Sequence, residues 1–174
     1  MKILQVTINP FPPEIRVYKE AISFKNLGYI SGVLSLSKSN EKEFEIINGI
    51  HVFRPSVLNK INIFDKIYSF FNFYNHKWSL ALKEVINEFN PDCIHYHDIW
   101  LGKNINSLIK KEKVIIDLHE NMPAAVDQWK KGANKFEWIL RYFFQKRKRL
   151  FYLERDLITR ADHILVVVKE AKER

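Results

Sequence analysis

Two stretches decide the fold: Cys93-Ile94-His95-Tyr96-His97 and, further on, Val114-Ile115-Ile116-Asp117-Leu118. Both are short, mostly apolar runs, which is typical of strands buried on both faces of a sheet. Between them, residues 101–111 carry apolar side chains at helical spacing. A strand, a helix and a second strand in this order predict two parallel neighbours joined by a helical crossover.

The same alternation continues outward in both directions. Asn48-Gly49 is the strongest short hairpin signal in the chain, and Gly28 is placed to end a helix that Pro12 or Pro13 begins. Further strands are predicted at residues 2–7, 29–36, 43–47, 50–54 and 164–168, and helices at 13–27, 61–89 and 136–160. We expect the strand at 164–168 to be buried, because it is an apolar run. The sequence therefore predicts a Rossmann-like α/β domain, a mostly parallel sheet with helices on both faces.

Length and composition bound the function classes. A chain of 174 residues with 47% hydrophobic residues makes one domain with a core of its own, and not a disordered or collagen-like protein. The single cysteine, Cys93, suits a reducing compartment, and the sequence shows neither an apolar run of membrane-spanning length nor a cleavable leader. We expect a cytoplasmic protein.

Positive charge is concentrated in one segment. Residues 130–160 hold 10 Lys/Arg against 3 Asp/Glu, whereas the whole chain carries a net charge of +8. A basic segment interleaved with aromatics can contact the anionic inner face of a membrane, or can simply pack on the sheet with a solvated charged face. No nucleic-acid-binding signature accompanies it. The membrane-facing candidates are Trp138, Tyr142, Lys146, Arg147, Lys148 and Arg149.

Polar residues follow the predicted strands, where ligands bind in open parallel sheets. Asn9 follows the first strand and Arg16 lies near the start of the first helix. His97-Asp98 and His119-Glu120 end two later strands. A histidine there can orient a sugar hydroxyl or take its proton. The alternatives are a surface histidine, a capping glutamate, and an exposed Arg16 paired with Glu20.

His95, His97 and Asp98 are candidate metal ligands, because the two imidazoles share one face of a strand and could reach one ion. With His119 they would offer a three-histidine site. We expect no metal, because His95 lies deep in the strand, where a buried neutral histidine that is hydrogen-bonded to backbone is commoner, and no zinc motif supports a site. The chain also lacks a G-x-G-x-x-G or P-loop pattern, which argues against a dehydrogenase or nucleotidase.

Four motifs in order resemble the N-terminal part of family-four retaining glycosyltransferases. The four motifs are Phe11-Pro12-Pro13-Glu14-Ile15-Arg16-Val17, Pro91-Asp92-Cys93-Ile94-His95-Tyr96-His97-Asp98, Asp117-Leu118-His119-Glu120 and Ala161-Asp162-His163-Ile164. The resemblance implies the GT-B architecture, in which two Rossmann-like domains face each other across a cleft. Residues 1–174 would form the acceptor-binding domain, and the donor-binding domain would be a separate partner.

The resemblance also implies roles. His119 would face the transferred sugar as the catalytic residue, and Asn9, Arg16, Asp98 and Glu120 would bind substrate. The donor would be a nucleotide-diphosphate sugar, the acceptor a hydroxyl of a polysaccharide or lipid-linked glycan, and no cofactor or metal would be needed. Where family members often carry two glycines after the first strand, this chain has Asn9-Pro10-Phe11-Pro12-Pro13. The domain alone is expected to be inactive.

One reading from another class stays open. A non-catalytic, flavodoxin-like module would have the same sheet and would dock on a membrane or a partner through the basic aromatic helix. The sequence does not distinguish this module from the glycosyltransferase domain.

Overall fold

The computed structural model describes residues 1–38, 41–97, 99–118 and 147–166. Seven strands in this part form one sheet, in the order β3-β4-β2-β1-β5-β6-β7. All neighbours are parallel except the antiparallel pair β3 and β4. The strands are β1 (Lys2–Pro10), β2 (Ile30–Leu36), β3 (Phe44–Ile47), β4 (Ile50–Phe53), β5 (Cys93–His97), β6 (Lys113–Leu118) and β7 (His163–Val166). The predicted fold class is confirmed.

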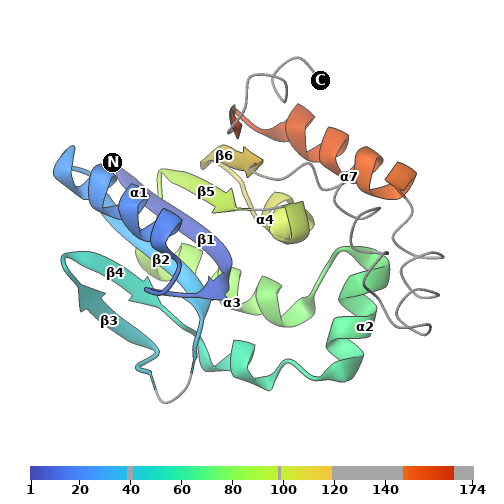
Figure 1. Cartoon of the computed structure of the whole chain (residues 1–174), viewed down its shortest axis with the longest axis horizontal. Helices are drawn as coiled ribbons and strands as arrows, with labels where there is room; N and C mark the ends of the chain where they lie inside the picture. The colour runs from blue at the N-terminus through green and yellow to red at the C-terminus, as the bar shows by residue number, and fades with distance from the viewer. Residues whose placement is uncertain (39–40, 98, 119–146, 167–174) are drawn as a thin grey trace.

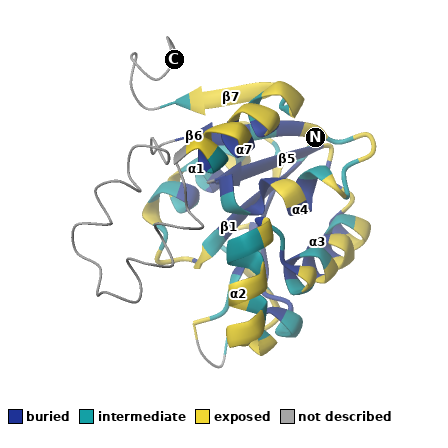
Figure 2. Cartoon of the chain, turned by 90° about the vertical axis from the view of Figure 1, so that its right-hand side faces the viewer, coloured by how far each residue is buried: buried dark blue, intermediate teal, exposed yellow. Residues whose placement is uncertain are grey.

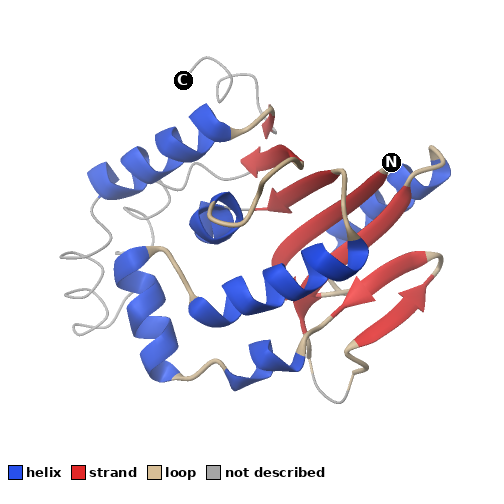
Figure 3. Ribbon diagram, turned by 180° about the vertical axis from the view of Figure 1, so that it is seen from behind, coloured by secondary structure: helices blue, strands red, loops and turns tan. Residues whose placement is uncertain are grey.

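Helices cover both faces of the sheet (Figures 1 and 3). Helix α1 (Ile15–Asn26) lies on one face, and α3 (His76–Phe89), α4 (Gly102–Asn106) and α7 (Arg147–Arg160) lie on the other. The remaining described helices are α2 (Ile63–Asn72) and the short 3-10 turns η1 (Ser56–Lys60) and η2 (Ile99–Leu101). The helix predicted at 101–111 is thus a single short α4, and the part of the 136–160 helix before Arg147 lies outside the described residues.

The connections create one point where the strand order reverses. From β1 the chain passes through α1 to β2 and then to the β3–β4 hairpin on one side of the sheet. It returns through α2 and α3 to β5, on the other side of β1. In open α/β sheets the crevice beyond such a reversal is where ligands bind. The carboxyl ends of β1 and β5 therefore mark the place to search for a site.

Most of the apolar core lies on the face covered by α3, α4 and α7. Leu4 of β1, Ile94 and Tyr96 of β5 and Ile116 of β6 are fully buried there. They pack with α3 and with the inner face of α7, which contributes Leu150, Leu153 and Leu157. Figure 2 shows these strands in dark blue beneath helices whose outer faces are exposed. Burial of these side chains holds the strand ends in register.

The predicted hairpin is confirmed. β3 and β4 pair with Ile47 opposite Ile50, and Asn48 and Gly49 have φ angles of 52° and 82°. Two successive positive φ values define the type I′ turn, whose twist matches that of the strands.

The single helical stripe predicted over residues 61–89 is wrong, because the segment folds as two helices. Phe73 has φ 53° and ends α2 in a left-handed conformation. The Asn75 side chain then accepts hydrogen bonds from the N–H groups of Lys77 and Trp78 and starts α3. Both halves have helical periodicity, but α3 buries five residues and α2 none. Periodicity alone therefore did not reveal the change of direction.

Two strand predictions need correction. Residues 9 and 10 belong to β1 and not to a loop, because β1 passes an irregularity after Val6 and pairs again at Pro10 with Leu36. The last strand was expected to be buried, yet His163, Ile164 and Leu165 of β7 are exposed. β7 is the outermost strand of the sheet, with β6 as its neighbour. Within the described residues, no helix is long and apolar enough to cross a membrane.

Candidate functional site

Asn9 and Arg16 lie together at the reversal point. Asn9 is near the carboxyl end of β1, and its Nδ2 donates to Glu14 Oε2 at 2.8 Å. Arg16 Nη2 lies 3.6 Å from Glu14 Oε1, so one carboxylate holds both residues. The structure thus brings these two predicted residues together. The alternative prediction, an exposed Arg16 paired with Glu20, differs from the structure, in which Arg16 pairs with Glu14.

A shallow pocket of about 570 Å³ opens beside them, lined by Glu14, Ile15, Arg16, Lys19 and Glu20. The Nε of Arg16 is buried and has no hydrogen-bond partner among the described residues. The guanidinium therefore keeps donor capacity for a ligand at the start of α1, where helix amides also favour an anion.

Asp98, His119 and Glu120 lie outside the described residues. The strands that precede them are described: β5, which ends at His97, pairs with β1, and β6, which ends at Leu118, pairs with β5. Convergence of these three residues with Asn9 and Arg16 on one rim stays a prediction.

A cluster of polar side chains lies under the rim, on the α1 face of the sheet. Gln5 of β1 and His95 and His97 of β5 are fully buried, and Glu20 of α1 reaches down to them. Glu20 Oε2 lies 2.9 Å from Gln5 Nε2, 3.6 Å from His95 Nδ1 and 3.6 Å from His97 Nε2. Asp117 of β6 completes the cluster, with its Oδ2 3.2 Å from His97 Nδ1.

Hydrogen bonds in the cluster favour one tautomer of His97. Gln5 Nε2 faces His97 Nε2 at 3.4 Å and is a donor, so Nε2 accepts. The proton then lies on Nδ1 and is donated to Asp117. His95 differs, since neither of its ring nitrogens has a hydrogen-bond partner among the described residues.

Burial sets the protonation of this cluster. Desolvation, with the nearby His97 also acting, lowers the pKa of His95 to about 3, so His95 is neutral at physiological pH. Burial is also the main cause that raises the pKa of Glu20; Asp117 adds to the shift, and His97 and Arg16 oppose it. The predicted burial of His95 is confirmed, but the hydrogen bond to backbone that was expected with it is not found among the described residues.

Arg54 holds the loop that follows β1 in place. Its side chain is 1% exposed, although it carries a charge, because several oxygens surround it. Nη2 donates to the carbonyl of Phe11 at 2.9 Å, and Nη1 to Glu45 Oε1 at 2.6 Å. Arg54 thereby ties the β3–β4 hairpin to the chain just after β1, which positions Asn9 and Glu14.

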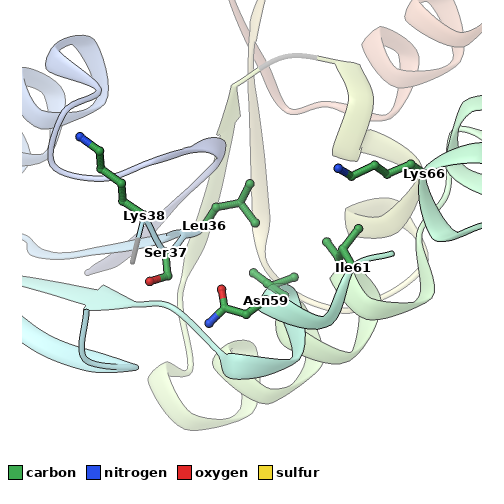
Figure 4. A pocket seen from close by; sticks show the side chains of 7 residues that line it. Leu36, Ser37, Lys38, Asn59, Ile61 and Lys66 are labelled. Atoms are coloured by element: carbon green, nitrogen blue, oxygen red, sulfur yellow. The ribbon is translucent and has the colours of Figure 1, made fainter. Parts of the chain in front are cut away.

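A second pocket, of about 440 Å³, opens at the carboxyl end of β2 (Figure 4). Leu36, Ser37 and Lys38 line one side, and Leu58, Asn59, Ile61 and Lys66 line the other. In Figure 4 the Lys66 side chain extends from α2 toward the side that carries Leu36. The pocket combines apolar walls with hydroxyl, amide and ammonium groups, which suits a polyhydroxylated ligand with negative charge.

Sequence reasoning missed this pocket and the cluster around Glu20. The available signal for the cluster was polar Gln5, His95 and His97 in otherwise apolar strands, where a buried polar side chain needs a partner. For the pocket the sequence carried no signal, because Ser37 and Asn59 meet only through the fold.

The basic segment is described in part. Trp138, Tyr142 and Lys146 lie outside the described residues, and Arg147 begins α7. Lys148 is exposed. The Arg149 guanidinium carbon lies 4.8 Å from the centroid of the buried Phe73 ring, so the start of α7 packs against the junction of α2 and α3.

Comparison with solved structures shows the fold. The chain is similar to sucrose-phosphate synthase from Thermosynechococcus elongatus, with a TM-score of 0.70 and 13% identity over 99% of this chain. A second structure of that synthase gives a TM-score of 0.63 and 11% identity, over 99% of this chain and 79% of the other. No protein-family model and no curated protein matches the sequence. The chain spans 44% of the first synthase, and at this identity the likeness shows a shared Rossmann-like fold.

Proposed function

We propose that this chain is the acceptor-binding domain of a retaining glycosyltransferase. It would take a sugar from a nucleotide-diphosphate donor and pass it to a hydroxyl of a polysaccharide or lipid-linked glycan, with no metal in the transfer step. The observation that carries the proposal is the likeness of nearly the whole chain in fold to a sucrose-phosphate synthase, together with Asn9 and Arg16 at the point where the strand order reverses.

The rim supplies groups that suit this chemistry. The guanidinium of Arg16, whose Nε–H has no hydrogen-bond partner among the described residues, would bind a phosphate of the nucleotide sugar, and Asn9 offers an amide beside it. His119, with Asp98 and Glu120, would complete the site from the ends of β5 and β6. The donor-binding partner domain would close over this rim, exclude water and align the two substrates.

The pocket after β2 is the proposed acceptor subsite. Ser37 and Asn59 face it with groups that can exchange hydrogen bonds with sugar hydroxyls, and Lys38 and Lys66 suit an acceptor that carries phosphate or carboxylate. Its volume of about 440 Å³ lies within the range of small-molecule sites.

The test is sugar transfer by the full-length protein that carries this chain, with a panel of nucleotide sugars. His119→Ala and Arg16→Ala should each lower kcat/KM at least 100-fold. Asn59→Ala should raise the acceptor KM and leave donor hydrolysis unchanged. Lys83→Ala and Asn87→Ala, both exposed on α3, are the matched controls. Transfer at the wild-type rate by His119→Ala and Arg16→Ala would remove the proposal.

A second candidate is peripheral docking on an anionic membrane, with or without catalysis. Helix α2 favours it, because it buries no residue and exposes Ile63, Phe64, Ile67 and Tyr68. The basic start of α7 packs at the end of this helix, so cations and apolar side chains lie close together.

Flotation with vesicles separates this candidate from the first. The protein should float with vesicles that contain anionic lipid and stay behind with neutral ones. Phe64→Ser should abolish flotation, whereas Leu27→Ser, which changes a similarly exposed apolar residue at the C-cap of α1, should not. Equal partition to both vesicle types, or equal loss in both variants, would exclude membrane docking.

A further inference from the structure

Three metal-ligating side chains from two distant segments meet beneath the rim. They are Glu20, from the middle of α1, and His95 and His97, from β5. One atom of each lies within 4.8 Å of the other two, and both imidazole nitrogens are 3.6 Å from Glu20 Oε2. We propose that Glu20, His95 and His97 form a binding site for Zn²⁺ or a similar divalent transition metal.

The spacing fits a tetrahedral ion. Zinc binds imidazole nitrogen and carboxylate oxygen at about 2.0–2.2 Å, which puts neighbouring ligand atoms roughly 3.4 Å apart. The two distances of 3.6 Å between imidazole nitrogen and carboxylate oxygen need only a small contraction to reach that value. The two imidazole nitrogens lie within 4.8 Å of each other and would have to draw closer around the ion. Two histidines and one glutamate are also a ligand set that zinc accepts, with a fourth position left for water.

The groups behind the ligands are arranged as in zinc proteins. A ligating histidine commonly gives its other ring N–H to a carboxylate, which orients the ring and raises its basicity. His97 Nδ1 lies 3.2 Å from Asp117 Oδ2, and its Nε2 is the nitrogen turned toward Glu20. The His97 tautomer that the hydrogen bonds favour, with the proton on Nδ1, is thus the one whose Nε2 lone pair can bind the ion.

His95 is the independent observation that points to a ligand. It is fully buried, and both ring nitrogens lack a hydrogen-bond partner among the described residues. An unpaired buried polar group costs about 1–3 kcal/mol. A metal on Nδ1 would use that lone pair, and it would explain why the fold places an imidazole there and not an apolar side chain.

Glu20 connects the site to a pocket that opens to solvent. The Glu20 side chain is 28% exposed and lines the 570 Å³ pocket, while the histidines lie beneath it. Gln5 Nε2, which now donates to Glu20 at 2.9 Å, borders the same space. An ion entering beside Glu20 would displace this bond and meet the two imidazoles.

The inference goes beyond the proposed transferase. The sequence suggested a metal at His95 and His97 with Asp98 or His119, and the structure supplies Glu20 as the third ligand candidate. The ion would link α1, through Glu20, to β5, through the two histidines. Arg16 lies one helical turn before Glu20 on α1, so the ion would also fix the position of Arg16. It has no part in the proposed transfer chemistry.

Direct metal binding tests the site without any activity assay. The full chain is dialysed against a chelator and titrated with Zn²⁺ in competition with a chromophoric chelator. We expect one ion per chain and a rise in the melting temperature at saturation. Co²⁺ should give the visible absorption of a tetrahedral centre.

Variants assign the ion to these residues. His95→Leu and Glu20→Gln should each weaken binding at least 100-fold, and Asp117→Asn 10–100-fold, as for other outer carboxylates. Glu14→Gln, beside the same pocket, and His163→Ala, an exposed histidine of β7, should bind as the wild type does.

Two outcomes would overturn the site. In the first, the wild-type chain binds Zn²⁺, and His95→Leu and Glu20→Gln bind it with the same affinity. In the second, the wild-type chain binds no more Zn²⁺ than these two variants do. Circular dichroism shows which variants fold. Because Glu20 lies at the surface of the cluster, Glu20→Gln decides the question if His95→Leu does not fold.

Discussion

The two faces of the sheet at β1 and β5 differ sharply, although the same strands build both. On the α3 face, alternate residues such as Leu4, Ile94 and Tyr96 enter one continuous apolar core. On the α1 face, the residues between them are Gln5, His95 and His97, and they contact charged Glu20. Because successive side chains of a strand point to opposite faces, one strand serves packing and chemistry at once.

The largest effect is expected on the packed face. Ile94→Ala deletes a fully buried side chain and leaves a cavity in the core. It should lower the free energy of unfolding by about 3 kcal/mol, measured by urea denaturation. Leu80→Ala, at an exposed position of α3, is the control and should cost less than about 0.5 kcal/mol. Equal effects of the two variants would contradict the core assignment.

A smaller loss is expected at Arg54, a buried charge with many partners. Arg54→Ala leaves the carbonyl of Phe11 and the carboxylate of Glu45 without their donor. We expect a loss of about 2 kcal/mol, less than for a fully buried pair because Glu45 is one-third exposed. Arg54→Lys should recover only part of it, because an ammonium cannot reach both oxygens as the fork does. A change in unfolding free energy below 0.5 kcal/mol would show that the hairpin does not depend on this contact.

His95→Leu should separate the two faces most clearly. In the metal-free protein its unfolding free energy should stay within about 1 kcal/mol of the wild type, because leucine removes a buried polar group that has no hydrogen-bond partner. Thermal and urea unfolding measure this. A loss as large as that of Ile94→Ala would mean that the imidazole makes an essential contact, and that the two faces are stabilised alike.

The smallest effect concerns pH at the far edge of the sheet. Hydrogen bonds from Lys113 and from the Val114 N–H lower the pKa of Asp162 below its ordinary value of 3.8. Because the folded pKa is the lower one, this stabilisation is present above about pH 4 and is lost as the pH falls through the folded value.

The measurement is the melting temperature between pH 2 and pH 6. Asp162→Asn should flatten its acid limb, while Glu84→Gln, an exposed carboxylate of α3, should leave the limb unchanged. An acid limb as steep in Asp162→Asn as in the wild type would contradict this role.

Local signals explain what the sequence predicted well. Asn48-Gly49 adopts positive φ angles at little cost, and the apolar runs of β5 and β6 leave no alternative to a buried strand. The break at Phe73 was not predictable in this way. Phe73 takes a left-handed conformation that its side chain does not favour, and packing of α3 on the sheet imposes it.

The candidate site likewise contains residues that the sequence predicts and residues that only the fold reveals. Position is enough to single out Asn9, at the end of a strand, and Arg16, at the start of the helix that follows, because parallel strands present their carboxyl ends, and the starts of the helices that follow, at one edge. Glu14, which holds both residues, and Glu20, which meets the histidines, are visible only in the folded chain.

The sequence by itself determined the order of strands and helices, the hairpin and the fold class, since these depend on periodicity and turn residues over short distances. Only the tertiary structure decided which polar side chains meet. That depends on how α1 crosses the sheet and on which face of β5 it covers, and contacts between segments far apart in the chain set both.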